Sequence, residues 1–288
     1  MPSPRNRPMQ HIDRKALYTD LEARVEYLQS FLDFGQSDID ALISGRKYIQ
    51  ALIPAVVNIV YKKLLQYDIT ARAFTTRSTA FEGPMDDVPD EESPQILHRK
   101  KFLGGYLKKL CSDPAQMEFF EYLDKVGMMH TGIGRANPLH IEYVHIGAAL
   151  GVIQDVFNEA LLSHPRLSMQ RKLAMIKALG KVIWIQNDLF AKWYVHDGEE
   201  YTAGVDYAPV VEKEGWLKGK KVLDDVDDEV DGAGKAGRGN ESDGSDDTAV
   251  TPGRRAAGLK GGCPFAGIVA GGKKVTFDEG RAEEVEAK

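Results

Sequence analysis

One segment of this 288-residue chain joins an amphipathic helix, a histidine and a glycine-rich turn: Phe119-Phe120-Glu121-Tyr122-Leu123-Asp124-Lys125-Val126-Gly127-Met128-Met129-His130-Thr131-Gly132-Ile133-Gly134. At helical spacing, the apolar side chains of Phe119, Leu123 and Val126 lie along one face. His130 continues this face at the last position before the glycines. The segment therefore predicts a helix that ends with an inward-pointing histidine.

The turn after this histidine contains Gly132, Gly134 and Asn137-Pro138, which end the helix at once. An imidazole at a helix end in an apolar wall can be the axial ligand of a flat, apolar cofactor such as haem. A single histidine on an apolar face is more often a buried residue whose ring nitrogen is satisfied by a carbonyl. Other segments of the chain must decide between these interpretations.

Composition limits the classes of partner. The formal net charge of -6 and the pI near 5.7 disfavour nucleic acid, because phosphate binding needs a basic face. Cys111 and Cys263 are far apart in sequence and suggest neither a disulfide framework nor a zinc site. Residues 1–8 lack the apolar core of a signal peptide, and the longest apolar run, Val144 to Ile153, is too short to span a bilayer. We expect a soluble, cytoplasmic protein in a reducing compartment, with no membrane partner.

The first part of the chain shows successive helical patterns. Residues 1–15 are rich in proline and arginine and are expected to be flexible. Apolar spacing predicts one helix from Leu17 to Leu32, and Gly35 ends it. Ser37 is a good cap for the next helix. Pro54 suits the first turn of a separate helix that follows.

Tyr61 lies beside the apolar stripe of that last helix, which contains Val57, Val60 and Leu64. The pattern places a phenol against the core. Its hydroxyl either reaches a backbone carbonyl, as in an ordinary core aromatic residue, or is a donor directed into a ligand cavity.

Residues 81–94 are acidic and contain three prolines, which predicts a surface loop. The carboxylates lack the spacing of a calcium-binding loop. A helical pattern resumes near Gln95 and runs to Leu110. After Pro114 the chain enters the helix that ends at His130.

Two long helices are predicted next, from Leu139 to about Ala160 and from Met169 to about His196. His140 and His145 lie off the apolar stripe of the first. We interpret them as partly exposed or satisfied histidines rather than as rival ligands. No strand pattern is present before residue 200, so residues 16–200 are predicted to form an all-α domain of seven or eight helices.

The composition changes beyond Tyr201: Leu223 to Asp247 is dominated by Asp, Glu, Gly and Ser, and the end of the chain is rich in Gly, Ala, Lys and Glu. Such a sequence buries too little apolar surface to offset the entropy of ordering, so residues 201–288 are expected to be a low-complexity, largely disordered tail. Trp216-Leu217 and residues 264–269 are its plausible contact points. Cys263-Pro264 resembles haem-regulatory dipeptides, although an inert cysteine is the simpler interpretation.

Four motifs occur together in this order: Val57-Asn58-Ile59-Val60-Tyr61 before Leu64-Leu65, then Val126 to Gly134, Leu139 to Gly147, and Trp184 to Tyr194. Together they resemble the protoglobin and globin-coupled-sensor branch of the globins, over about residues 20–196. The resemblance implies a globin fold of the sensor-globin or protoglobin type. Such a fold has an extra helix before the usual globin start and holds haem b.

The resemblance also implies roles for individual residues. By position, His130 is the proximal iron ligand and Tyr61 the distal hydrogen-bonding residue. The remaining distal wall would include Phe102 or Leu103, and the register does not decide which of them stands over the iron. Thr131, or the carbonyl of Val126 or Gly127, would hold the second ring nitrogen of the proximal histidine. The positions expected to contact the haem are Tyr61, Phe102, Leu103, Val126, Met129, His130, Ile141 and Tyr143.

Three functions remain open at this point. The first is reversible binding of a diatomic gas (O2, CO or NO) by a sensor, store or scavenger. The second is a haem enzyme, such as an NO dioxygenase or a peroxidase-like protein, in which His98 could approach the pocket one turn before Phe102. The third is a cofactor-free helical scaffold whose acidic tail recruits partners.

Two departures from the family pattern bear on these functions. The acidic, proline-rich stretch is longer than is usual in the family, and no recognisable output module follows the helical region. A single-domain protein is therefore favoured over a sensor with a fused transmitter. In the resembling family the paired final helices form a homodimer, which is carried over here as an expectation.

Overall fold

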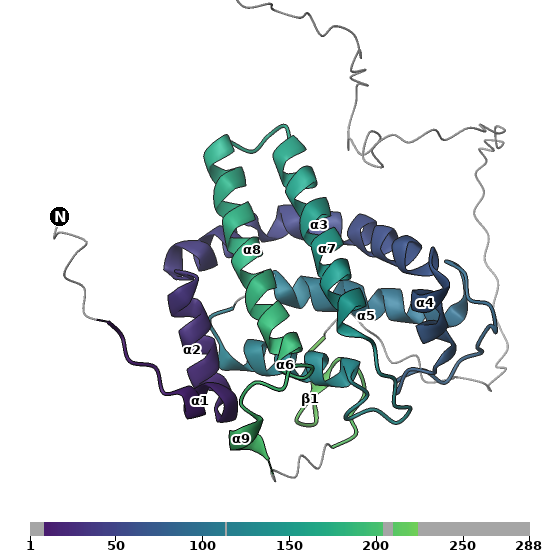
Figure 1. The fold of residues 1–288 in the computed structure, drawn as a ribbon. Helices are drawn as coiled ribbons and strands as arrows, with labels where there is room; N and C mark the ends of the chain where they lie inside the picture. The colour runs from purple at the N-terminus through teal and green to yellow at the C-terminus, as the bar shows by residue number, and fades with distance from the viewer. Residues whose placement is uncertain (1–8, 113, 204–209, 224–288) are drawn as a thin grey trace, which may run out of the picture. The chain divides into compact units, whose positions relative to one another are not determined.

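The computed structural model describes residues 9–112, 114–203 and 210–223, which are mostly helical (Figure 1). The helices are α1 (Arg14–Thr19), α2 (Leu21–Phe31), α3 (Gln36–Leu65), α4 (Asp68–Ala71), α5 (Pro94–Leu110), α6 (Met117–His130), α7 (Tyr143–Ser163), α8 (Met169–Ala191) and α9 (Glu199–Thr202). A 3-10 turn covers Arg72–Thr75, and β1 (Trp216–Leu217) pairs with β2 (Lys220–Lys221) in a short antiparallel hairpin. The all-α prediction is confirmed. The predictions for residues 1–8, for the tail from 224 onward and for Cys263 lie outside the described residues.

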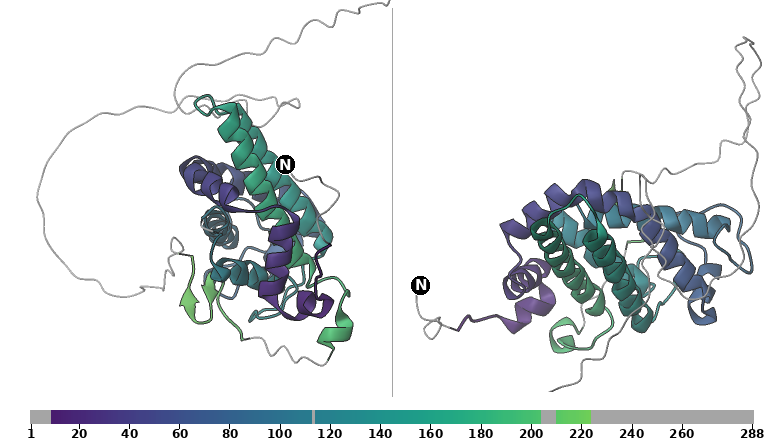
Figure 2. Two further views of the ribbon diagram at one scale, coloured as in Figure 1. Left: turned by 90° about the vertical axis from the view of Figure 1, so that its left-hand side faces the viewer. Right: turned by 90° about the horizontal axis from the view of Figure 1, so that it is seen from above.

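Helices α7 and α8 form an antiparallel pair that lies side by side in Figures 1 and 2; α3 packs against both of them, and α6 packs against α8. Helix α3 also packs against α5. The largest fully buried side chains include Leu42, Ile49 and Ile53 of α3, Phe119, Phe120 and Leu123 of α6, Phe157 and Leu161 of α7, and Met175 of α8. Helix α8 ends at Ala191, earlier than the predicted end near His196. The core therefore lies where α3 and α6 meet the α7–α8 pair.

The predicted helix from Leu17 to Leu32 is divided into α1 and α2 at Asp20. The backbone of Asp20 is extended (φ -127°, ψ 116°). Its carboxylate accepts hydrogen bonds from the N–H groups of Glu22 and Ala23 and so caps α2. A strong cap inside a continuous apolar pattern thus starts a new helix.

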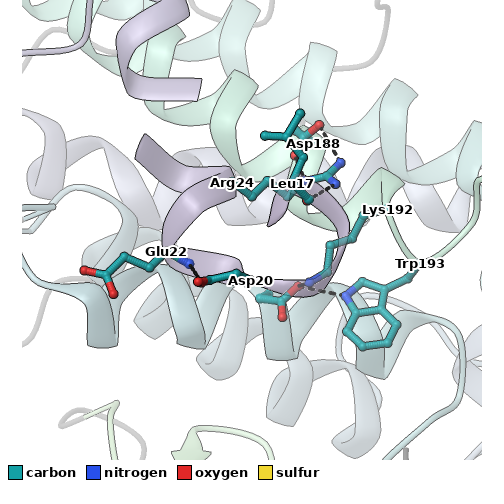
Figure 3. Close-up of polar contacts among 8 residues, drawn as sticks. Leu17, Asp20, Glu22, Arg24, Asp188, Lys192 and Trp193 are labelled. Atoms are coloured by element: carbon teal, nitrogen blue, oxygen red, sulfur yellow. Dashed lines mark hydrogen bonds and ion pairs between the residues drawn. The ribbon is translucent and has the colours of Figure 1, made fainter. Parts of the chain in front are cut away.

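Figure 3 shows how α2 is fastened to the end of α8. The Arg24 guanidinium donates to both carboxylate oxygens of Asp188, from Nε at 2.6 Å and Nη2 at 3.0 Å, and to the carbonyl of Leu17. The indole N–H of Trp193, just after α8, donates to Asp124 of α6 at 2.9 Å. These contacts fix the carboxyl end of α8 against both α2 and α6.

The two helices predicted to meet at Pro54 are one 30-residue helix, α3, so the prediction of a helix start at Pro54 is wrong. A proline inside a helix removes a backbone hydrogen bond and costs about 3 kcal/mol. Burial of side chains such as Ile53 and Val57 against α5, α7 and α8 contributes about 1.5–3 kcal/mol each and outweighs that cost. The cap of α3 is Gly35 rather than Ser37, because the Asp38 carboxylate accepts from the Gly35 N–H at 3.1 Å.

By length and composition alone, α3 could cross a membrane. The core helix of a globular protein has the same properties. Helix α3 contacts α5, α7 and α8. The observation is therefore weak support for a membrane-spanning segment.

Helix α7 begins at Tyr143 rather than at the predicted Leu139, because the chain after α6 makes a compact turn. Gly132 and Gly134 adopt positive φ angles of 91° and 74°, which glycine reaches without steric cost. The N–H of Ile141 then donates to the carbonyl of His130, the last residue of α6, at 2.8 Å. The turn therefore returns the chain to the end of α6.

Residues 210–223 do not form part of a separate tail. Lys125 of α6 forms an ion pair with Glu212 at 2.5 Å, and the Glu214 carboxylate accepts from the N–H groups of Thr79 and Ala80. Residues 210–223 thus contact the helical region across the domain boundary that was predicted at residue 200. These charged and backbone contacts, together with the buried side chains of Leu217 and Leu223, join the segment to the helical region.

Candidate cofactor site

A cavity of about 600 Å³ lies among α3, α5, α6, α7 and α8. This volume is within the range of about 300–1,000 Å³ that is usual for cofactor and ligand pockets. Most of the predicted contact residues line it: Tyr61, Phe102, Leu103, Val126, Met129, His130 and Ile141. Tyr143 is not among the lining residues, because its side chain turns toward α8, where its hydroxyl donates to Asn187 at 2.7 Å. The structure thus brings seven of the eight predicted positions together.

His130 is the last residue of α6, and its ring borders the cavity. Nδ1 lies 2.7 Å from the carbonyl oxygen of Val126. A carbonyl can only accept, so Nδ1 carries the proton and Nε2 carries a free lone pair. Of the orienting partners considered from the sequence, the Val126 carbonyl is the one observed, since the Thr131 hydroxyl donates to Met128 instead.

The environment of His130 keeps the imidazole neutral. Burial lowers the pKa of His130 below 6.5, and the nearby Arg135 and Arg99 guanidinium groups lower it further, against the opposing effect of the Val126 carbonyl. The ring packs beside Phe190 of α8 with a centroid separation of 5.3 Å. A neutral, oriented imidazole with a free Nε2 is the form that binds a metal.

Gly127 allows α8 to approach α6 closely beside this histidine. A Cβ atom at position 127 would lie 2.9 Å from the carbonyl oxygen of Leu189 and 2.9 Å from Cα of Phe190. Only a residue without a side chain fits there. The glycine therefore sets the distance between the helix that carries His130 and the helix that supports its ring.

Tyr61, near the carboxyl end of α3, places its phenol at the same cavity. The side chain is 7% exposed and packs on Phe74 with a centroid separation of 5.6 Å. Burial raises the pKa of Tyr61 far above 10, although the nearby Arg99 charge partly opposes the shift. Its hydroxyl has no hydrogen-bond partner among the described residues, and the phenol is therefore a protonated donor available to a ligand.

Helix α5 forms another wall of the cavity through Arg99, Phe102, Leu103 and Tyr106, which recur at helical spacing. Both sequence candidates for the distal wall, Phe102 and Leu103, line the cavity. His98 is not among the lining residues, and its ring packs between Phe81 and Phe102 at 4.8 Å from each. The residue considered for acid-base chemistry is thus held within a ring cluster.

His140 and His145, which the sequence left as possible rivals to His130, also line the cavity. The ring of His140 packs against Tyr194 at 5.5 Å, and Nε2 of His145 lies 3.3 Å from the Glu142 carboxylate. Within the described ranges, no group of three or more His, Cys, Asp or Glu side chains could hold a metal ion.

Five charged residues of the cavity lining were missed from the sequence: the exposed Arg72 and Glu142, and the less exposed Arg99, Arg135 and Glu214. Arg99 lies one turn before Leu103, a spacing that could have revealed it. Arg135 follows the glycines after α6, and its guanidinium lies 3.6 Å from the Glu214 carboxylate. Glu214 lies in the expected tail, so no pattern pointed to it.

Buried polar atoms of the cavity-lining residues provide a test of which group fits. Nε of Arg99, Nε of Arg135, Nε2 of His145, the Tyr106 hydroxyl and Oε1 of Gln186 lack a hydrogen-bond partner among the described residues. Buried polar groups are nearly always paired, so these atoms call for a ligand with polar groups of its own. A haem group fits, because its ring suits the apolar walls and its carboxylates suit the two guanidinium groups.

The domain is helical, and an oriented, neutral histidine and a buried phenol border a common apolar cavity, which is the arrangement expected of a globin. Residues 21–200 match the family model Protoglobin, which covers more than half of the chain, and the chain belongs to the protoglobin family. The family implies a haem cofactor. Comparison with curated proteins finds no match to the chain.

Proposed function

We propose that this protein holds haem b through His130 and reversibly binds a diatomic gas, O2, CO or NO, as a sensor, store or scavenger. The observation that carries the proposal is the Nδ1 contact of His130 with the Val126 carbonyl, at 2.7 Å, in a cavity of suitable size. This contact leaves the Nε2 lone pair available. Bound haem would supply iron that can bind a diatomic gas.

The residues around the cavity have distinct roles in this proposal. Phe102, Leu103 and Met129 provide apolar surface for the porphyrin ring and exclude water. Arg99 and Arg135 provide guanidinium groups for the propionates. Phe190 supports the ring of the proximal histidine. Each role follows from side-chain chemistry that borders one cavity.

Tyr61 is the proposed donor to bound O2. O2 on ferrous iron carries partial negative charge, and a hydrogen bond from a buried phenol to it contributes about 1 kcal/mol or somewhat more. CO is less polar and gains less from the same donor. The phenol therefore favours retention of O2 relative to CO.

A homodimer through α7 and α8 is part of the proposal. Both helices carry large apolar side chains exposed to solvent in the single chain: Val144, Leu162, Leu173 and Trp184. Trp184 is 58% exposed, and aromatic anchors are enriched at interfaces. Sedimentation of the wild type and of Trp184→Glu tests this: a dimer that dissociates in the variant supports the interface, and a wild-type monomer excludes it.

Absorption spectroscopy tests the proposed function. Purified protein with one haem per chain should show a Soret band that shifts when CO is added to the reduced form and returns when CO is removed. O2 should give a second reversible spectrum. A protein that stays colourless after haem addition, or a haem complex whose spectrum no gas changes, would refute the proposal.

A further inference from the structure

Residues 210–223, called the strap below, lie beyond the region that matches the protoglobin model, which ends at residue 200. The strap contains the β1–β2 hairpin. Two of its residues, Glu214 and Gly215, line the cavity together with His130 and Tyr61. A part of the chain outside the family pattern thus contributes to the wall of the candidate haem pocket.

The strap is fastened to α6 at a position close to the candidate proximal ligand. Lys125, which is 8% exposed and lies five residues before His130, forms an ion pair with Glu212 at 2.5 Å. Its ammonium group also donates to the carbonyl of Trp216. The Glu212 carboxylate accepts in addition from the Gly219 N–H at 2.6 Å, which closes the hairpin. Such a largely buried pair is costly to break, because one charge would remain without its partner.

Glu214 is fixed in the cavity wall by three contacts. Its carboxylate accepts from the N–H groups of Thr79 at 3.0 Å and Ala80 at 2.8 Å, and it lies 3.6 Å from the Arg135 guanidinium. The next residue, Gly215, has a φ of 82°, and a Cβ there would lie 3.2 Å from the Phe102 ring. The strap backbone therefore reaches the same wall as the distal aromatic residue.

Among the less exposed charged side chains that line the cavity, cations outnumber carboxylates. Arg99 and Arg135 supply two largely buried cations, and Glu214 is the carboxylate that faces them from the strap. Arg72 and Glu142 also border the cavity, but both are exposed to solvent, where their effect is screened. Removal of Glu214 would take one negative charge away from beside these two cations, in addition to any charge that the haem carboxylates supply.

We propose that Glu214 is a positioning residue that holds Arg135 in the pocket wall and sets the net charge beside the iron. The strap thereby lowers the reduction potential of the bound haem and limits its affinity for anionic ligands. This inference rests on the proposed function. Its physical basis is that an added positive charge in a weakly screened site disfavours ferric iron and attracts anions, whereas removal of a positive charge does the opposite.

Two variants and their combination test this inference. Spectroelectrochemical titration of the haem-loaded protein should give a higher midpoint potential for Glu214→Gln, a lower one for Arg135→Gln, and a value near that of the wild type for the double variant. Azide affinity of the ferric form should rise in Glu214→Gln and fall in Arg135→Gln. Affinity for imidazole, a neutral ligand, should change little in either.

A merely structural role for Glu214 predicts a different pattern. Loss of either partner would then loosen the same wall, so both single variants would shift the potential and both ligand affinities in one direction. That result, or no shift in either variant, overturns the inference. The Glu214→Asp variant, which keeps the charge, should stay near the wild type. If Glu214→Gln does not fold, Arg135→Gln still tests the proposal. An unchanged or raised midpoint potential of the haem in Arg135→Gln contradicts it.

Haem content measured before each titration separates failure of the proposed function from failure of the proposed role of Glu214. A wild type that does not bind haem refutes the proposed function and this inference with it. A wild type that binds haem and CO, with variants that lack opposite shifts, refutes only the role of Glu214.

Discussion

Replacement of Gly127 by alanine should weaken the fold and the haem site together, because the added Cβ meets backbone atoms of α8. The new atom would lie 2.9 Å from the Leu189 carbonyl oxygen and from Cα of Phe190, whereas an ordinary contact is at least 3.4 Å. The two helices must therefore separate by about 0.5 Å, the difference between these distances. Neither obstacle is the flexible end of a side chain, so neither can rotate away.

Two opposing terms set the magnitude of this effect. Overpacking of a tight contact costs about 1–3 kcal/mol, and the change from glycine to alanine in a helix returns about 1 kcal/mol. The net loss of unfolding free energy is then up to about 2 kcal/mol, or roughly 30-fold in the unfolding equilibrium. The displaced Phe190 also supports the His130 ring, so haem should dissociate faster.

Urea unfolding and the rate of haem transfer to an excess of apomyoglobin measure the two effects. Gly180→Ala is the matched control, because Gly180 is also inside a helix and a Cβ there would meet only Gln154 at an ordinary 3.9 Å. That variant should be as stable as the wild type or more so. If Gly127→Ala were as stable as the wild type and kept haem as long, the close contact of α6 with the α8 backbone at Gly127 would be contradicted.

Three further predictions follow from individual contacts. Tyr61→Phe removes the hydrogen-bond donor at the cavity. Loss of a hydrogen bond worth about 1 kcal/mol should raise the O2 dissociation rate about 5- to 10-fold and should change the CO dissociation rate little. Stopped-flow measurements check both rates. Because burial lowers the pKa of His130, its imidazole takes up a proton at a higher pH in the unfolded chain than in the folded one. The unfolding free energy of the apoprotein should therefore fall as the pH drops from about 6.5 toward the lowered pKa, and above about 6.5 it should not depend on this group. Urea titrations at several pH values should show this slope in the wild type and not in His130→Ala. Arg24→Met breaks the bidentate pair with Asp188 and should cost about 1–3 kcal/mol, whereas Arg14→Met, at an exposed pair, should have a much smaller effect on the urea midpoint.

Much of the helical framework could be predicted from the sequence, because it depends on periodic burial. The stripe that ends at His130, the position of Tyr61 beside its stripe and the end of α6 at the glycines all follow from local spacing. The errors arose where tertiary packing overrides a local signal. Pro54 predicts a helix start, but burial of the surrounding face of α3 keeps the helix continuous.

The polar part of the candidate site was the part that could not be predicted. The pairing of Arg135 with Glu214 joins residues 79 positions apart, and no local pattern encodes that contact. Glu212 and Glu214 lie in the predicted tail, and only the fold shows that Lys125 pairs with Glu212 and that two backbone N–H groups donate to Glu214. The contact of Tyr143 with Asn187 could not be predicted for a related reason, because Asn187 lies on another helix.

Haem titration of the His130→Gly variant decides whether this histidine holds the iron. The expected result is loss or marked weakening of haem binding, with recovery of a CO-responsive Soret band when imidazole is added to replace the missing ligand. His145→Gly, which alters another histidine of the same cavity, should bind haem without added imidazole. Haem binding by His130→Gly that matches the wild type in affinity and spectrum, with no response to imidazole, would contradict the assignment of His130 as the ligand.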